Sequence, residues 1–236
     1  YLARYLGYTL VEGGDLTVRG RSVLLKTLGG LLPVDVMLRR VADDDCDTLE
    51  LRADSHFGVP GLVHAARSGQ VAMANALGSG LLEAPALMAF LPRICRELLG
   101  EELKLPSVPT WWCGRDDDRD YVRRNLAELI VRPAFQHRAA QPIVGRQLTA
   151  AQRDELWARI SRRPGEYVAQ SVVTRSTAPV WSNGALQPWR VGLRTFAVAL
   201  GDGYRVMPGG LSRVSSDQEF VGESFAAGQA SKDVWI

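Results

Sequence analysis

Arg194 and Arg213 are the two residues whose type and spacing best suit a chemical role. A guanidinium is planar and donates two parallel hydrogen bonds, so it suits a phosphate or a carboxylate. The sequence between them predicts a hairpin, with strands over Leu193–Leu200 and Tyr204–Met207 and a glycine-containing turn at 201–203. That hairpin would fold both guanidiniums toward one site. The spacing leaves open the alternative that each arginine is a solvated charge at the end of a strand.

Polar residues follow two further predicted strands. Val34–Arg40 is largely apolar, as expected in a sheet covered on both faces, and it leads into acidic residues at 43–47. Val71–Ala74 is a second buried strand, and the sequence NALGSG follows it at 75–80. We expect both strands in one largely parallel sheet, whose carboxyl edge is where α/β proteins bind ligands. A glycine-rich loop there can turn N–H groups toward a phosphate, but a solvated loop or a turn without a ligand explains the same residues.

The length and charge of the chain exclude few classes of protein. A chain of 236 residues can bury a substantial core and form one large domain or two small ones. The net charge of +2 gives no reason to expect nucleic acid or a membrane as partner, and no apolar run reaches the ~18 residues of a membrane span. We expect no signal peptide. The chain begins inside an apparent helix, so we expect it to be part of a longer protein.

The cysteines and histidines predict no metal site. Cys46, Cys95 and Cys113 are widely spaced and form no CxxC pair, so we expect three reduced, unpaired thiols that bind no metal. The three histidines are too few and too scattered to indicate a ligand set. Reduced thiols are typical of a cytoplasmic protein, which is the location we expect. Nothing in the sequence indicates an oligomeric state.

The proline-containing segment Leu105–Thr110 predicts a domain boundary. We expect an α/β domain over 1–104 and an α+β region with antiparallel strands over 105–236. The elements expected in the second region are a helix over Asp116–Asn125, a strand over Leu129–Pro133, a helix that begins at a capping box of Thr149 and Gln152, a strand over Tyr167–Gln170 and a turn at 182–185.

Ten fragments of the sequence, taken in their order and spacing, resemble one protein family. They are RRVADDDCD (39–47), DSHFGVPGL (54–62), NALGSG (75–80), LPSVPTWWCG (105–114), LIVRPAF (129–135), YVAQ (167–170), STAPVW (176–181), LRTFAV (193–198), MPGGLSRV (207–214) and SKDVWI (231–236). Together they resemble the circularly permuted ATP-grasp type 2 family, which is related to glutathionylspermidine-synthase-like ligases. The resemblance covers essentially the whole chain, and the joint pattern is more specific than any single motif.

The resemblance implies an ATP-dependent carboxylate–amine ligase with ATP and Mg²⁺ as cofactors. The implied fold is a circularly permuted ATP-grasp, in which a pre-ATP-grasp sheet domain (1–104) precedes ATP-grasp subdomains (105–236). A small-molecule or peptide carboxylate would be activated as an acyl phosphate, and an amine would displace the phosphate. Positioning and charge neutralisation supply most of the catalysis in such phosphoryl transfer. Family members are longer and carry an upstream magnesium motif of the Glu/Asn type, which this chain does not contain.

The resemblance also implies which side chains handle phosphate. Arg194 and Arg213 would be the catalytic residues that hold the phosphate or acyl phosphate. Arg132 stands where the family usually has a phosphate-binding lysine in its KP strand, and it keeps the charge without a lysine's compact ammonium group. No metal ligand is implied within the chain, because the magnesium motif lies upstream.

Four other residues would contact the nucleotide or the substrate. Gln170 and Ser171 lie on the hinge segment that would contact adenine. Asn75 would bind the nucleotide. Together with Arg40, it would also line the side of the site where the substrate binds. The resemblance therefore places one set of residues in each of the two expected domains.

Several departures from the family's pattern favour a second hypothesis. Arginine replaces lysine at 132, and Ala84-Pro85 stands where many relatives have Asp-Lys. The glycine-rich lid after the KP strand is replaced by AFQHRAA at 134–140, and AAGQA at 226–230 replaces a tail richer in glycine. These changes favour a degenerate, non-catalytic ATP-grasp-like module that binds a partner or a peptide. The retained Arg194, Arg213 and Asn75 favour the ligase, so both functions remain open.

Overall fold

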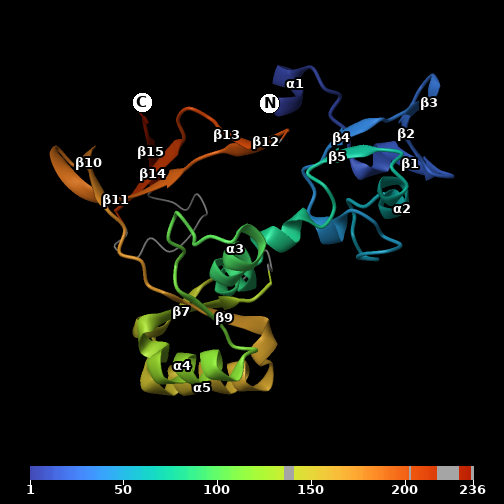
Figure 1. Cartoon of the computed structure of the whole chain (residues 1–236). Coiled ribbons are helices and arrows are strands. Elements are labelled where there is room, and N and C mark those ends of the chain that lie inside the picture. Colours follow the sequence, from blue (N-terminus) through green and yellow to red (C-terminus); the bar gives the residue numbers. More distant parts are fainter. Residues whose placement is uncertain (136–140, 202, 217–228, 235–236) are drawn as a thin grey trace. The chain divides into compact units, whose positions relative to one another are not determined.

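The structure is a computed structural model that describes residues 1–135, 141–201, 203–216 and 229–234. Contacts divide the chain into two compact units, Tyr1–Leu87 and Met88–Ile236 (Figure 1). The division falls earlier than the boundary expected at 104/105, because the residues after Leu87 contact the second unit. The Nε2 of Gln170 donates to the Sδ of Met88 at 3.4 Å, and the rings of Phe90 and Trp112 lie 5.8 Å apart. The assignment of 1–104 and 105–236 to the parts of an ATP-grasp protein stays a prediction.

The first unit contains a three-stranded antiparallel sheet. Its strands are β1 (Leu16–Arg19), β2 (Ser22–Thr27) and β3 (Gly30–Pro33), in the order β1-β2-β3. Gly20-Arg21 forms the β1–β2 turn, and Gly20 has the positive φ of 61° that glycine adopts without strain. Strand β3 was not expected. The sheet of this unit is therefore not largely parallel.

The first unit also contains one parallel pair of strands. Strand β4 (Val36–Leu38) pairs with β5 (Ala72–Ala74), and Met37 lies opposite Met73. The two predicted strands thus share a sheet, although both are shorter than expected. One face of the pair contributes Met37 and Met73 to the core. The other face carries Val36, 71% exposed, and Leu38, 46% exposed, so the prediction of a strand covered on both faces is wrong for this unit.

The core of the first unit lies between these strands and a short helix. The helical elements are α1 (Leu2–Leu6), α2 (Leu62–Arg67) and 3₁₀ turns at Gly13–Asp15, Asp43–Asp45 and Ser79–Glu83. The fully or nearly fully buried side chains that fill the core are Leu16, Val23, Cys46, Val59, Leu62, Ala65 and Val71. Two long loops, 39–61 and 75–87, leave the carboxyl ends of β4 and β5.

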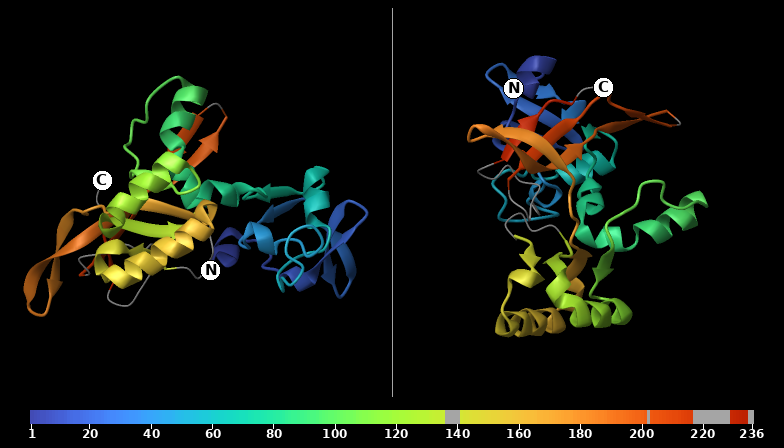
Figure 2. Two further views of the ribbon diagram at one scale, coloured as in Figure 1. Left: turned by 90° about the horizontal axis from the view of Figure 1, so that it is seen from below. Right: turned by 90° about the vertical axis from the view of Figure 1, so that its left-hand side faces the viewer.

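The second unit contains a four-stranded sheet with two helices on one face (Figures 1 and 2). The strands are β6 (Thr110–Trp112), β7 (Leu129–Pro133), β8 (Ile143–Val144) and β9 (Tyr167–Ser171), in the antiparallel order β6-β9-β7-β8. The helices are α4 (Asp116–Asn125) and α5 (Ala150–Arg162). They bury one core with the sheet, made of Cys113, Val122, Leu126, Leu129, Val131, Leu156, Ile160 and Ala169.

Local signals fixed the ends of several helices in this unit. The predicted capping box is present, because Thr149 Oγ1 accepts from the Gln152 N–H at 3.3 Å and the Gln152 side chain accepts from the Thr149 N–H at 2.8 Å. A 3₁₀ turn, Pro85–Ala89, precedes helix α3 (Leu91–Leu99). Gly100 ends α3 with a φ of 69°. Further 3₁₀ turns lie at Leu126–Glu128, Gly145–Gln147 and Pro164–Glu166.

A second antiparallel sheet in this unit has the order β10-β11-β14-β15. Its strands are β10 (Thr177–Ser182), β11 (Ala185–Arg194), β14 (Leu211–Ser215) and β15 (Gln229–Lys232). The predicted turn between β10 and β11 is confirmed. Its central residues Asn183 and Gly184 have φ values of 52° and 78°, the conformation that a two-residue hairpin turn requires.

The hairpin expected over 193–207 is displaced along the chain. It consists of β12 (Ala197–Leu200) and β13 (Gly203–Val206), and β11 ends before it at Arg194. The expected single strand Leu193–Leu200 is therefore wrong, because its first two residues pair with β14 and its last four with β13. All eight residues of β12 and β13 are exposed. Within the described residues, no helix is long and apolar enough to cross a membrane.

Candidate functional site

Arg194 and Arg213 lie on neighbouring strands of the second sheet. Gly192 is directly opposite Arg213 in the β11–β14 ladder, and Arg194 is opposite Leu211. Because residues two apart on a strand share a face, Arg194 and Arg213 are diagonal neighbours on one face of the sheet. Pairing of β11 with β14 places the two arginines on neighbouring strands, and the convergence of their guanidiniums on one site stays a prediction. The β12–β13 hairpin only connects the two strands.

The two arginines differ in their surroundings. Arg213 is 7% exposed, whereas Arg194 is exposed to solvent. Strand β14 is buried over Ser212, Arg213, Val214 and Ser215, so polar and charged side chains occupy an inner strand of this sheet. A buried guanidinium next to an exposed one suits an anion that is bound on one side by the protein and open to solvent on the other.

Arg132 and Gln170 lie on one face of the other sheet. Arg132 is opposite Val168 and Gln170 is opposite Ile130, so Arg132 and Gln170 are diagonal neighbours on β7 and β9. Leu129, Val131 and Ala169 face the helices α4 and α5, hence Arg132 and Gln170 face away from them. Ser171 follows Gln170 and therefore lies on the helix side, so the two residues expected at adenine point to opposite faces.

The amide of Gln170 is engaged within the protein. Its Nε2 donates to Thr110 Oγ1 at 3.1 Å and to Met88 Sδ at 3.4 Å, and the residue is 8% exposed. The backbone N–H of Ser171 donates to the Pro109 carbonyl at 3.0 Å. The contact with Met88 holds the residues around Met88 against this face of the sheet, and the other two contacts join β6 and the residue before it to β9.

The four residues expected to surround one nucleotide come from two sheets. Arg132 and Gln170 belong to β7 and β9, and Arg194 and Arg213 belong to β11 and β14. Each pair is brought together by strand register alone. The convergence of all four at one nucleotide stays a prediction.

Arg39 in the first unit is a residue that the sequence analysis did not select. Its guanidinium is buried and bonds to both loops that leave the parallel strands. It donates to the carbonyls of Asn75 at 3.0 Å, Ala76 at 3.0 Å and Val41 at 2.5 Å, and to Ser79 Oγ at 3.1 Å. Asp43 pairs with the same guanidinium at 2.6 Å. Arg39 therefore fastens the loop after β4 to the loop after β5.

These contacts correct the interpretation of the NALGSG loop. The carbonyls of Asn75 and Ala76 face a cation, and the N–H of Gly80 donates to the Asp43 carboxylate at 2.7 Å. A loop that presents carbonyl oxygens to a guanidinium is not organised as an anion cradle on that side, because a phosphate needs N–H donors. The alternative of a turn without a phosphate fits this side of the loop better.

Arg40 and Asn75 lie at the carboxyl edge of the parallel pair. Arg40 comes two residues after β4 and Asn75 directly after β5, and both residues are exposed. Since β4 and β5 run parallel, their carboxyl ends share one edge, which is the usual place for ligand contacts in such sheets. The structure thus brings Arg40 and Asn75 to one edge, with Arg39 fixed beneath them.

Asp47 uses its carboxylate to hold the start of helix α2. Oδ1 accepts from the N–H of Leu49 at 2.8 Å, and Oδ2 accepts from the N–H of Val63 at 2.9 Å. Burial raises the pKa of Asp47, but the backbone hydrogen bonds from Val63, Leu49, Gly61 and Glu50 outweigh burial and leave the pKa below its ordinary value. Asp47 is therefore an ionised structural group.

The three cysteines are free in the structure, and all three are buried. Burial raises the pKa of Cys46, although the nearby Arg39 opposes this shift. Burial also raises the pKa of Cys113 to about 11, and the charge of Asp118 adds to the effect. A thiol with a raised pKa is a poor nucleophile, so neither residue is suited to covalent catalysis.

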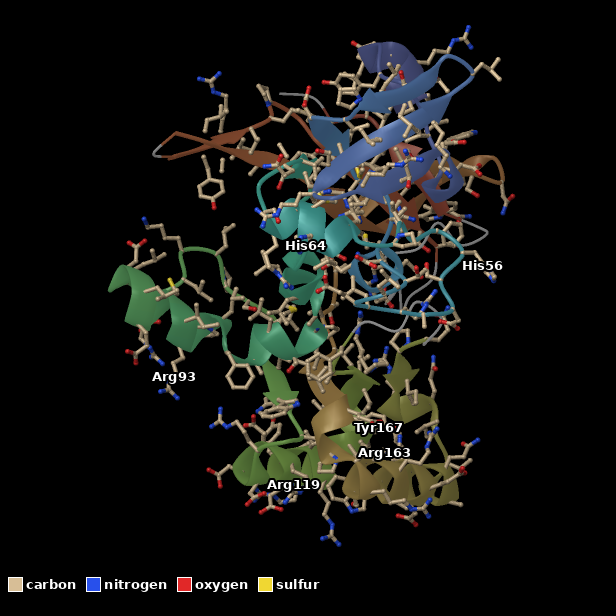
Figure 3. All side chains as sticks on the ribbon, turned by 90° about the vertical axis from the view of Figure 1, so that its right-hand side faces the viewer. His56, His64, Arg93, Arg119, Arg163 and Tyr167 are labelled. Carbon is tan, nitrogen blue, oxygen red and sulfur yellow. The ribbon has the colours of Figure 1, made fainter. Side chains whose placement is uncertain are left out.

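Residues that could ligate a metal do not gather in the described part of the chain. There, no three His, Cys, Asp or Glu residues lie close enough to hold a metal ion. His64 lies on α2 and His56 in the loop before it, as the labels in Figure 3 show. The same view places Arg119 on α4 and Arg163 just after α5, both in the helical layer of the second unit.

Comparison with known proteins decides the family. The family model described as "Circularly permuted ATP-grasp type 2" matches residues 1–215. The chain belongs to this family. The sheets and helices described above therefore form a mixed helix-and-sheet fold of that family. The match with the family model ends at Ser215, the last residue of β14.

The curated relatives are longer than this chain. An uncharacterized protein of Mycobacterium tuberculosis (strain ATCC 25618 / H37Rv) is 39% identical over 238 residues, which cover 100% of this chain and 26% of the relative. An uncharacterized protein of Synechocystis sp. (strain ATCC 27184 / PCC 6803 / Kazusa) is 37% identical, with 100% and 49% covered. One of Mycobacterium leprae (strain TN) is 35% identical, with 100% and 42% covered. This circularly permuted ATP-grasp chain thus spans about a quarter to a half of those proteins.

Proposed function

We propose that the chain is part of an ATP-dependent carboxylate–amine ligase that forms a peptide-type bond through an acyl phosphate. The observation that carries the proposal is the diagonal placement of Arg194 and Arg213 in a chain of the ATP-grasp family. Two guanidiniums on one sheet face can neutralise the charge of a phosphoryl group while a carboxylate oxygen attacks it. The family suggests ligase-type activity, and the acyl phosphate and the substrates belong to the proposal.

The described residues fit ATP better than they fit Mg²⁺. ATP needs cations and hydrogen-bond donors, which Arg194, Arg213 and Arg132 supply on two sheets. Mg²⁺ needs several carboxylate or carbonyl oxygens together, and the described residues offer no such group of acids. We therefore assign no magnesium ligand within the chain and derive no step through the metal.

Each expected site residue has a proposed role. Arg194 and Arg213 hold the transferred phosphoryl group, and Arg132 contacts the phosphates from β7. Gln170 and Ser171 lie beside the adenine, where Gln170 keeps one amide oxygen available after its two donations. In the first unit, Arg40 binds the substrate carboxylate and Asn75 orients the substrate or the nucleotide at the same edge.

A non-catalytic binding module is the second candidate, and two observations favour it. The donors of Gln170 are already used within the protein, and the NALGSG loop presents carbonyls to Arg39. Arginine at position 132 and Ala84-Pro85 also depart from the family's usual lysines. The segments 136–140 and 226–228, where the lid and tail departures lie, are outside the described residues except for their flanks.

Calorimetry with ATP and Mg²⁺ on the longest natural form of the protein distinguishes the two candidates. A ligase binds ATP, and Arg194→Ala or Arg213→Ala weakens that binding by about 10- to 150-fold, because each removes a charged hydrogen bond. Hydroxylamine then traps the acyl phosphate as a hydroxamate when a panel of amino acids and short peptides is supplied. Absence of ATP binding by the folded protein removes the ligase and leaves the binding module.

A further inference from the structure

Little of the described chain packs against helix α3. Cys95 is the one buried residue among the nine of this helix. Helices shorter than about 12–15 residues are not stable in water by themselves and depend on the packing of an apolar face. The contact between the rings of Phe90 and Trp112 holds the beginning of the helix. The rest of the helix therefore needs a further packing surface.

The apolar residues of α3 form one continuous stripe. The residues three, four, seven and eight positions after Leu91 are all apolar, which is the spacing of one helix face. The five residues of the stripe are Leu91, Ile94, Cys95, Leu98 and Leu99. The charged residues of the helix, Arg93, Arg96 and Glu97, lie on the opposite side, and Arg93 is labelled in Figure 3. The pattern is that of a helix with one face buried.

Exposure increases along this stripe toward the end of the helix. Leu91 is half-buried and Cys95 is buried, whereas Leu98 is 77% and Leu99 is 69% exposed. Ile94, on the same face, is also exposed. The last turn of the stripe thus extends beyond the residues that cover its first turns. An exposed apolar patch along one face of a helix is typical of a helix that docks into a groove.

The charges near the stripe favour an uncharged partner surface. The charged side chains of α3 and of the residues after it pair with one another, as Arg93 with Glu97 at 4.0 Å, Arg96 with Glu102 at 3.3 Å and Lys104 with Glu101 at 3.2 Å. The segment 91–104 contains three positive and three negative residues, so its charges cancel. Apolar contact is therefore what a partner of this helix would recognise.

The size of the stripe argues against a second copy of the chain as the partner. Ile94, Leu98 and Leu99 can bury about 100 Å² each, so two stripes packed together would bury about 600 Å². A stable interface between separate proteins buries about 1,200–2,000 Å². A small contact is sufficient when both surfaces belong to one polypeptide, because the linked surfaces meet at a high effective concentration.

The lengths of the relatives provide a source for such a surface. The chain covers 26% of the Mycobacterium tuberculosis relative and 49% of the Synechocystis relative. We infer that this chain belongs to a longer protein, as its relatives do, and that the stripe of α3 docks into an apolar groove formed by residues outside 1–236. The inference concerns the assembly of the protein and does not depend on the proposed ligase activity.

Hydrogen exchange of the longest natural form of the protein measures whether α3 is covered. The amides of residues 95–99 are expected to exchange slowly, because docking stabilises the last turn of the helix. Leu98→Asp is expected to speed this exchange by about 10- to 150-fold, as the loss of a buried leucine does. Fast exchange in the wild type would overturn the inference.

Glu97→Gln is the matched control for Leu98→Asp. It changes the neighbouring residue on the opposite side of the helix, so the exchange rate is expected to stay within about twofold of the wild type. Equal acceleration in the two variants would show a general effect on the helix and overturn the docking site. Circular dichroism verifies that each variant is folded.

Photo-cross-linking identifies what covers the stripe. Leu98 is replaced by the photoreactive residue p-benzoylphenylalanine in the longest natural form, and Glu97 is replaced by the same residue as the control. The expected result is a cross-link from position 98 to a peptide outside residues 1–236 of the same polypeptide, and none from position 97. Cross-linked dimers would identify a second copy, and cross-links within 1–236 would identify another part of this chain. Either result would overturn the inference, as would equal cross-linking from both positions.

Discussion

The guanidinium of Arg39 and the carboxylate of Asp43, both in the loop after β4, form an ion pair at 2.6 Å at the carboxyl edge of β4 and β5. The second oxygen of this carboxylate accepts the N–H of Gly80 at 2.7 Å. The pair thus belongs to a network that reaches from one loop to the other. The exposed residues Arg40 and Asn75 are held by a structure buried below them.

Replacing Arg39 tests the strength of this network. Arg39→Met leaves Asp43 without its cation and the carbonyls of Asn75 and Ala76 without a donor, so we expect a loss of about 3–5 kcal/mol in the stability of the first unit. All six tryptophans lie beyond residue 87, so tryptophan fluorescence does not report this unit. Hydrogen exchange of peptides from residues 1–87 is the suitable measurement.

Arg40→Met provides the comparison for Arg39→Met. Arg40 is exposed, so its replacement is expected to change stability by no more than about 0.5 kcal/mol. Equal exchange in both variants would contradict a structural role for Arg39.

The carboxylate of Asp47 makes the first unit sensitive to acid. Its folded-state pKa lies below the ordinary value, because backbone N–H groups outweigh burial. Its contribution is therefore fully present above the unfolded-state pKa of about 3.9 and is lost as the pH falls through the folded-state pKa. We expect Asp47→Asn to lower stability at pH 7 by about 0.5–2 kcal/mol and to reduce the acid sensitivity seen by hydrogen exchange. Asp54→Asn, at an exposed carboxylate, should leave both unchanged.

The thiol of Cys113 gives the second unit a dependence on alkaline pH. Its folded-state pKa of about 11 exceeds the unfolded value of about 8.5, so the neutral thiol favours the folded state. This contribution is complete below the unfolded pKa and is lost as the pH rises toward 11. Urea unfolding followed by tryptophan fluorescence should show a loss between pH 8.5 and 11 that Cys113→Ala lacks.

Thiol titration checks the state of the cysteines directly. Unfolded, unreduced protein should react at three thiols, and the folded protein should protect Cys113, which is fully buried. A count of one thiol in the unfolded protein would mean that two cysteines are bonded to each other.

Gly145 lies very close to the backbone of another segment in the second unit. A Cβ there would overlap the carbonyl oxygen of Leu126, which is backbone and cannot rotate away. We expect Gly145→Ala to lower the stability of this unit by about 1–3 kcal/mol, as overpacking does. At Gly165 a Cβ would meet Trp112 at 3.8 Å, an ordinary contact, so Gly165→Ala should unfold at nearly the wild-type urea concentration. A similar midpoint for both variants would refute this account.

Elements specified by local residues were predicted well. The Thr149–Gln152 capping box, the helix over Asp116–Asn125 and the Asn183-Gly184 turn depend on contacts within a few residues, so the sequence alone indicates them. The displaced hairpin shows the opposite case. Leu193 and Arg194 pair with Ser212 and Leu211, and long-range pairing of this kind leaves no local signal at Arg194, where the strand ends.

The sequence indicates Arg40 as a site residue and does not indicate Arg39, for a related reason. Strand β4 is apolar at every position, so the alternation that would show which residues face the core is missing. The structure fixes the phase by burying Met37, which places Arg39 on the same inner side and Arg40 outside. The sequence can predict that Asn75 and Arg40 share the carboxyl edge of the parallel strands. It cannot predict that the guanidinium of Arg39 binds the loops at that edge.

The separation of β4 and β5 along the chain has a consequence for the order of folding. Val36 pairs with Ala72, 36 residues later (72 − 36), whereas β1 and β2 are joined by a two-residue turn. Closing the longer loop loses more chain entropy, so the parallel pair is expected to form after the β1–β2 hairpin. The loops that carry Arg40 and Asn75 would then become ordered late during synthesis and would open first under mild denaturation.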